Sequence, residues 1–475
     1  VFLIYKMRST LIFGRTTFYH DNMLWNYPVF QFFAENIINN RFPFWNPFAH
    51  SGEPLYPILA QLRLYEPITL LTIYLGQFFS NDIVLLFNWN LITKSLLMVF
   101  GVYIVFRPLA KHLLVRLFLI PILLYSSFMV VSFRQCGLYD QFILIPYVMF
   151  FLLRIVYHKD YRWHNWLVLA GTIGLNWQSY FFTGTWTFLL LFSLGFLLFR
   201  RDLLAGLFRS KMIVVKLAVM TAIIIAMATP SIILLLEKDK YAFPARMLDT
   251  SYEGKIPQGG PQQYEGELLD SVSSNSGINM PYNFIAFTGT FSTIWDFIQI
   301  LSPDGSNHVK WSGRNLWGDP SEAYMYLGIL PWLIAILGMV AGKHDLKNVW
   351  LLLLIGFGLL MLGPPGGLHR LMYYIYPPMW FVRHTHSFVL FFVFALIYFF
   401  ILGFNHIFSV WGKSLFCPEK SHGIISRFVK NDRYHKSVAI FLFSTCIIIS
   451  IYWMTRLEYP STNYLFTFLV LIFAV

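Results

Sequence analysis

The sequence predicts an all-α fold: a polytopic bundle of transmembrane helices with amphipathic helices in its extracytoplasmic loops. Hydrophobic residues make up 57% of the chain and charged residues only 12%, whereas soluble domains carry about 25% charged residues. Repeated apolar runs approach the roughly 20 residues that a helix needs to cross a bilayer. A single soluble core would not bury this much apolar surface, so we expect a multi-pass integral membrane protein.

The predicted spans follow from these apolar runs. One segment, 57–79, is apolar but contains Arg63 and Glu66, so it is predicted as an interfacial or re-entrant helix. The spans are predicted, in chain order, at 82–106, 113–131, 135–157, 163–182, 184–199, 212–236, 322–341, 347–363, 387–409, 437–455 and 460–475.

The basic residues orient this map. More than half of the 35 Lys and Arg residues fall in the short alternate loops, which the positive-inside rule assigns to the cytoplasm. The predicted organisation is an extracytoplasmic segment 1–81 with interfacial helices, helices over 82–236, an extracytoplasmic loop 237–321, and helices over 322–475 that enclose an outer loop, 363–387. Both chain ends lie in apolar sequence, so we expect a helix before residue 1 and further helices after residue 475.

Net charge and cysteine content exclude several classes of site. The net charge is +12, but basic residues beside membrane helices explain it, and no nucleic-acid partner is expected. Cys136, Cys417 and Cys446 show neither a disulfide framework nor metal-ligand spacing. Since the chain also has no phosphate-binding glycine loop, nucleophile elbow or zinc-binding histidine pair, no cofactor-binding site is predicted.

A polar, aromatic segment near the start of the chain carries the first candidate residue, Asp21. A carboxylate is costly inside lipid and tolerated at its surface, so Asp21 is a candidate catalytic base or metal ligand at the membrane surface. The alternative is an N-cap for a helix over 22–39, since Asp before a helix accepts hydrogen bonds from free N–H groups. The two interpretations are compatible.

The run RFPFWNPFAHSGEPL follows in the same segment. Its prolines predict extended turns, and Gly52 permits a sharp bend. His50 is therefore a candidate substrate contact and Glu53 a candidate catalytic acid. The alternative is that the aromatic residues simply anchor a loop at the membrane interface.

Several charges fall inside or beside predicted spans, where they are costly unless they are paired or face water. Asp140 is the next candidate acid, and Arg63 and Arg134 are candidates for substrate binding. Structural ion pairs are the alternative. The late outer loop, HRLMYYIYPPMWFVRHTHSF, adds Arg370, Arg383 and His384. Arginine suits bidentate phosphate binding, and the alternative is snorkelling at a helix entrance.

Ordered landmarks along the chain resemble those of a known family. They are GRTTFYHDNMLWNYPVFQFF, NNRFPFWNPFAHSGEPLY, YEPITLL, NWQSYFF, EAYMYLGILPWLIAILGM and YIYPPMWFVRHTHSFVLFFVFAL. In these the chain resembles the bacterial YfhO-type membrane proteins of the C-type glycosyltransferase (GT-C) superfamily. The resemblance implies an enzyme of the bacterial inner membrane that takes a sugar from a polyprenyl-phosphate carrier. It would pass the sugar to an acceptor on the extracytoplasmic face.

The resemblance also implies residue roles. Asp21 matches the family's first-loop acid, which implies a catalytic base or, in members that use a divalent metal, a metal ligand. Arg383 matches the late-loop arginine and would stabilise the departing polyprenyl phosphate, with Arg370 or a metal as alternatives. The usual second arginine is absent, since RHTHS stands in its place, and no D-x-D pair is present. Metal dependence is therefore left open.

Two other functions remain open from the sequence. A transporter or lipid flippase would use Lys94 and Asp140 along its path, but no inverted repeat is visible. A non-catalytic GT-C-like scaffold subunit of a larger membrane complex would use the aromatic residues, 19% of the chain, as a packing surface. Both alternatives keep membrane lipids as partners.

Overall fold

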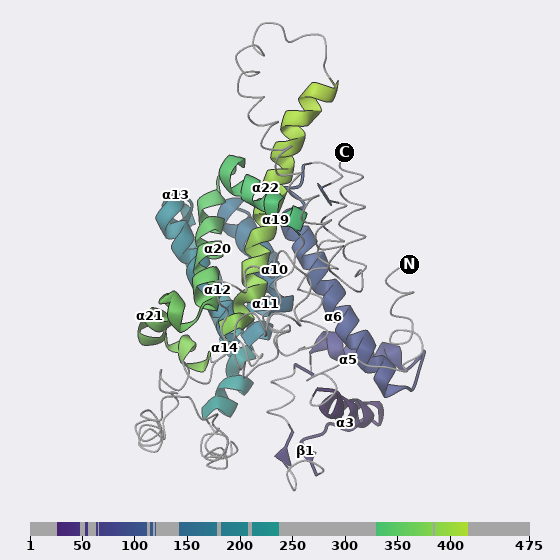
Figure 1. Ribbon diagram of the computed structural model, residues 1–475. Helices are drawn as coiled ribbons and strands as arrows, with labels where there is room; N and C mark the ends of the chain where they lie inside the picture. The colour runs from purple at the N-terminus through teal and green to yellow at the C-terminus, as the bar shows by residue number, and fades with distance from the viewer. Residues whose placement is uncertain are drawn as a thin grey trace, which may run out of the picture.

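A computed structural model describes residues 26–47, 53–55, 63–64, 66–111, 115–116, 119, 142–177, 182–207, 211–236, 329–382 and 385–416. The described chain is mostly helical (Figure 1). Its elements are α3 (Tyr27–Ile38), β1 (Trp45–Asn46), β2 (Glu53–Pro54), α5 (Pro67–Gly76), α6 (Ile83–Phe106), α10 (Ile145–Leu152), the π-helix η2 (Leu153–Tyr157), α11 (Trp163–Trp177), α12 (Phe182–Phe199), α13 (Arg201–Leu207), α14 (Lys211–Leu236), α19 (Ile329–Ala341), α20 (Lys347–Met361), the 3-10 helix η9 (Pro364–Gly366), α21 (Leu368–Ile375), the 3-10 helices η10 (Pro377–Phe381) and η11 (Thr385–Phe388), and α22 (Val389–Phe416).

Three helices within these ranges are long and apolar enough to cross a membrane by length and composition: Ile83–Phe106, Met212–Thr229 and Val389–Ser409. Helices also occupy most of the other predicted spans, but several are shorter, such as Lys347–Met361. The predicted spans 437–455 and 460–475, most of 113–131 and the loop 237–321 lie outside the described residues.

Local sequence explains where several helices begin. The Asp82 side chain caps α6, because its Oδ1 accepts hydrogen bonds from the backbone N–H of Val84 at 2.9 Å and of Leu85 at 3.4 Å. Pro67 occupies the first turn of α5, where a missing N–H costs nothing. Gly367 precedes α21 with a φ of 72°, a conformation that favours glycine.

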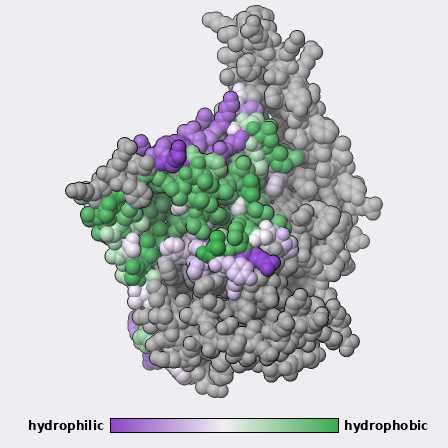
Figure 2. All heavy atoms as spheres, turned by 90° about the vertical axis from the view of Figure 1, so that its left-hand side faces the viewer, coloured by the Kyte–Doolittle hydropathy of each residue, from purple (hydrophilic) through white to green (hydrophobic). Residues whose placement is uncertain are grey.

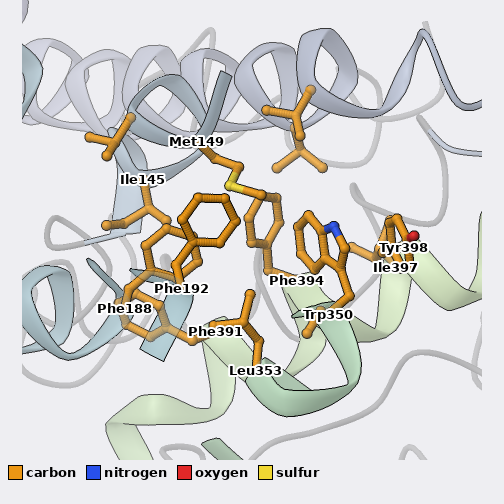
Figure 3. Packing of buried hydrophobic residues seen from close by; sticks show 14 of the residues in the cluster. Ile145, Met149, Phe188, Phe192, Trp350, Leu353, Phe391, Phe394, Ile397 and Tyr398 are labelled. Carbon is orange, nitrogen blue, oxygen red and sulfur yellow. The ribbon is translucent and has the colours of Figure 1, made fainter. Parts of the chain in front are cut away.

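An aromatic core fills the space between the helices (Figure 3). Trp350 of α20 stacks on Tyr398 of α22 with ring centroids 4.7 Å apart, and two turns along the same pair of helices Phe357 stacks on Phe391 at 4.9 Å. Phe394 lies between these pairs, 5.5 Å from the Trp350 ring. All five side chains are buried, so the centre of this helix group is dry and closely packed.

Two glycines bring α19 and α22 into backbone contact. A Cβ atom on Gly338 would overlap the Phe399 carbonyl oxygen, and one on Gly403 would overlap the Ile334 carbonyl oxygen. Gly342 lies one turn beyond Gly338, and a Cβ atom there would crowd the Gly338 carbonyl oxygen and the Leu402 side chain of α22. Small residues spaced by four allow helices to approach this closely, as in many membrane proteins.

Basic and acidic side chains gather at one end of the helices, which we call the basic end. Asp345, before α20, accepts a hydrogen bond from the Tyr157 hydroxyl at 3.4 Å and lies 3.6 Å from Nη1 of Arg200. On α22, the Asn405 amide donates to the Leu109 carbonyl at 2.7 Å. The loops that follow α6, η2 and α12 therefore lie at the same end as the loop before α20, as the alternating map predicts for loops on one side.

Candidate functional site

Polar groups meet at the other end of the helices, which we call the α21 end. There Arg63 forms an ion pair with Glu66, and its Nη1 donates to the Asn176 side-chain oxygen at 3.2 Å. Asn176 lies in the last turn of α11. The contact ties the chain just before α5 to a helix 113 residues further on.

This contact, the Arg63–Glu66–Asn176 clamp, is enclosed by protein. The side chains of Arg63 and Glu66 are 1% and 3% exposed, and Asn176 is fully buried. Burying a charge costs desolvation energy, and the ion pair with Glu66 offsets part of this cost for Arg63. The Arg63–Glu66 pair is the structural ion pair that the sequence left open as the alternative to substrate binding by Arg63.

The Arg63 backbone takes part in the same arrangement. Its φ of 52° lies in the left-handed region, which costs a residue other than glycine on the order of 1 kcal/mol or more. Its carbonyl oxygen accepts a hydrogen bond from the Thr69 hydroxyl at 3.4 Å, which attaches it to the first turn of α5. The clamp therefore holds a strained turn as well as two charges.

The chain before α5 also contains a short antiparallel pairing. Trp45 lies opposite Pro54 and Asn46 opposite Glu53, and the Leu55 N–H donates to the Phe44 carbonyl at 2.9 Å. Glu53 is thus fixed in β2. Near this pairing, α3 packs its buried residues, such as Phe30, against Phe87 of α6, with ring centroids 5.2 Å apart.

Two residues of the chain between α21 and α22 pack on the ends of α12 and α20. Tyr376 lies beside Thr187 of α12; burial raises the pKa of its hydroxyl, and Thr187 acts against that increase. The Thr385 hydroxyl donates to the Met361 carbonyl, the last residue of α20, at 3.4 Å. These contacts place Tyr376 and Thr385 at the same end as the clamp.

His369 points from α21 into this packing and is fully buried. Desolvation lowers the pKa of its imidazole to about 4, although a hydrogen bond with the Val382 backbone acts in the opposite direction. The side chain is therefore neutral at pH 7. Arg370, the next residue, is exposed.

Polar residues are also buried along α6. Lys94 is 3% exposed, and Asn90 lies one turn earlier on the same face of the helix. Asn88 and Ser95, seven residues apart, are fully buried as well. The location of Lys94 agrees with the expectation that a charge inside a span faces the protein interior.

The structure thus brings together only part of the predicted site. Arg63 lies in the clamp, Glu53 in β2 and Arg370 on the surface of α21. Asn176, Thr187 and His369 were not predicted as members, and the single available signal for Asn176 was a polar residue within the NWQSYFF landmark. The candidates Asp21, His50, Arg134, Asp140, Arg383 and His384 lie outside the described residues.

No cluster of metal ligands is found among the residues that the structure describes. Within the ranges described above, no group of three or more His, Cys, Asp or Glu side chains is placed to hold a metal ion. Asp21, the candidate metal ligand, lies outside those ranges.

No protein-family model, curated protein or solved structure matches the chain.

Proposed function

We propose that the chain is a polytopic membrane enzyme of the glycosyltransferase class, which moves a sugar from a polyprenyl-phosphate donor to an acceptor on the extracytoplasmic face. The observation that carries the proposal is that two distant segments of the chain reach the same end of the helices. The clamp attaches Arg63 and Glu66 to the end of α11, and Tyr376 and Thr385 contact α12 and α20.

These two segments hold most of the candidate acids and arginines. A donor with a lipid tail and a phosphate needs apolar helices for the tail and polar groups at the helix ends for the phosphate. The α21 end has exposed apolar residues on α5 and α21, and Arg370 is exposed beside them. In this proposal Asp21 accepts the proton of the acceptor hydroxyl. Arg383, together with Arg370, stabilises the negative charge that develops on the leaving phosphate.

The aromatic core favours an enzyme over a transporter. A transport path would need polar groups or water along the helices. Polar side chains are buried on α6, but stacked rings such as Trp350, Phe357 and Phe391 fill the space between α20 and α22. Chemistry confined to one end requires no such path.

The proposal is tested with Asp21→Asn in purified protein reconstituted into nanodiscs, supplied with a panel of radiolabelled polyprenyl-phosphate sugars. We expect Asp21→Asn to abolish transfer while the protein stays folded, because the amide cannot accept the proton. Asp82→Asn is the matched control: it makes the same change at the start of α6, and Asn caps a helix about as well as Asp.

The outcomes separate the alternatives. Near-normal transfer by Asp21→Asn would remove Asp21 from the mechanism. If the unmodified protein transfers none of the sugars but co-purifies in fixed stoichiometry with a larger complex, the scaffold alternative is favoured. Uptake or lipid flipping in vesicles would instead favour the transporter.

A further inference from the structure

The helix α21 has two apolar faces, of which only one is covered by protein. Its inner face buries His369, Met372 and Tyr373. Its outer face leaves Leu371, Tyr374 and Ile375 exposed by 55%, 64% and 67%. We call these three residues the α21 patch. A continuous apolar surface of this kind indicates a partner that is itself apolar.

A second exposed apolar surface lies on α5 and the turn that follows it. Its members are apolar or aromatic and are all at least two-fifths exposed; the last two are the most exposed, at 79% and 82%. This α5 patch consists of Leu71, Tyr74, Leu75, Phe78 and Phe79.

The two patches lie at the same end of the helices. The far end of α6 reaches the basic end, where Leu109 contacts Asn405, so the beginning of α6 and the α5 patch before it lie at the α21 end. α20 likewise starts beside Asp345 at the basic end and finishes just before α21. Figure 1 shows α5 and α21 on opposite flanks of the helices at similar heights.

The surface between the patches and the basic end is apolar too. Exposed residues include Leu96 and Phe100 on α6, and Val214 and Ile225 on α14. Figure 2 shows a broad hydrophobic surface on the flank that carries α12, α20 and α21, with a hydrophilic strip along its upper border. The patches therefore continue the surface that the proposed function places in lipid.

We propose that the α21 patch and the α5 patch together seat the protein in the headgroup layer of the outer leaflet, at the boundary with the acyl chains. The inference rests on the membrane placement in the proposed function. Tyrosine at helix ends, such as Tyr74 and Tyr374, is typical of this layer, and Arg370 on the exposed side of α21 suits lipid phosphates. Two supports on opposite flanks fix how deep the clamp lies.

The test measures the depth of single spin labels in nanodiscs of phosphatidylglycerol and phosphatidylethanolamine. Cys136, Cys417 and Cys446 are first replaced by serine. Cysteines are then introduced one at a time by Ile375→Cys and Phe79→Cys in the patches. Phe100→Cys on α6 is the control for lipid, and Lys343→Cys, exposed at the basic end, is the control for water.

We expect labels at 375 and 79 to collide several-fold less often than the label at 343 with a water-soluble nickel chelate, and more often than the label at 100. They should collide readily with dissolved oxygen, which concentrates in lipid. Chelate collisions at 375 and 79 as frequent as at 343 would overturn the inference. Shielding of both labels from both reagents would overturn it too, because a protein partner would then cover the patches.

The controls keep this result separate from the proposed function. If the label at 100 also meets the chelate freely, the membrane placement itself is wrong, and the inference falls with it. If the label at 100 is protected but the patches are not, only the inference fails. Sugar transfer is not measured, so its absence does not affect the result.

Discussion

The two ends of the helices hold their charges in opposite ways. At the basic end, Asp160 bonds to Arg154 and Arg162 at 2.7 and 2.8 Å in a partly solvated network, and the Arg162 guanidinium holds the pKa of Asp160 well below its usual range. At the α21 end, one ion pair, Arg63 with Glu66, is almost completely buried.

The difference shows that ion pairs affect stability differently at the two ends. Solvated ion pairs add little stability, since water screens them and ordering long side chains costs entropy. A buried pair also adds little net stability, yet removing one partner leaves an uncompensated charge inside the protein. Cohesion near the basic end therefore comes from the glycine-mediated contact of α19 with α22, whereas the α21 end depends on an intact clamp.

The largest expected effect is a break of the clamp. Arg63→Met should lower the free energy of unfolding by about 3–5 kcal/mol, because Glu66 is left buried without its partner. The double variant Arg63→Met/Glu66→Met should recover much of this loss. Thermal unfolding in detergent measures both, and Arg200→Met at the basic end is the control. Equal losses from Arg63→Met and Arg200→Met would end the distinction between the two ends.

The second effect tests cohesion near the basic end. Gly403→Ala should lower the free energy of unfolding by about 2–3 kcal/mol, since the new methyl group overlaps backbone atoms of α19 and the helices must separate. The same substitution at Gly171, where nothing lies within 4 Å, should be neutral or stabilising by up to about 1 kcal/mol. Similar results at both positions would contradict the close contact.

The third effect is a dependence on pH at the α21 end. The folded pKa of His369 is about 4 and the unfolded value about 6.5, so the unfolded chain binds the proton first. Stability from the neutral imidazole is complete above pH 6.5 and is lost as the pH falls toward 4, by about 2 kcal/mol at pH 5. His369→Gln should lose less stability between pH 7 and pH 5. Melting temperatures measured between pH 7 and pH 5 check this prediction. An equal decrease for both proteins would show that His369 is not buried in the neutral form.

The smallest effect should come from the solvated charges. Asp345→Asn removes the partner of Arg200 and Tyr157, but Asp345 is 68% exposed, so the free energy of unfolding should fall by less than about 1 kcal/mol. Salt at 1 M should reduce even this difference. A loss comparable to that of Arg63→Met would mean that the basic end also depends on its ion pairs.

The sequence determined the positions of the helices because hydropathy is a local property. The predicted run 82–106 became α6 at Ile83–Phe106, and 347–363 became α20 at Lys347–Met361. It also marked Arg63 and Glu66 as charges that need either a partner or contact with water, because a charge in an apolar segment is costly wherever the chain folds. Of the other predicted site residues, Glu53 lies in β2, Arg370 is exposed on α21, and the rest lie outside the described residues.

Only the tertiary structure decided which residues contact one another across distant parts of the chain. Asn176 meets Arg63 across 113 residues, and Gly338 meets the backbone of α22 far along the chain. His369 becomes a neutral, buried imidazole because α21 turns that side of the helix toward the protein. Such contacts depend on which helix faces which, and the apolar pattern of one segment contains no information about the identity of its neighbour.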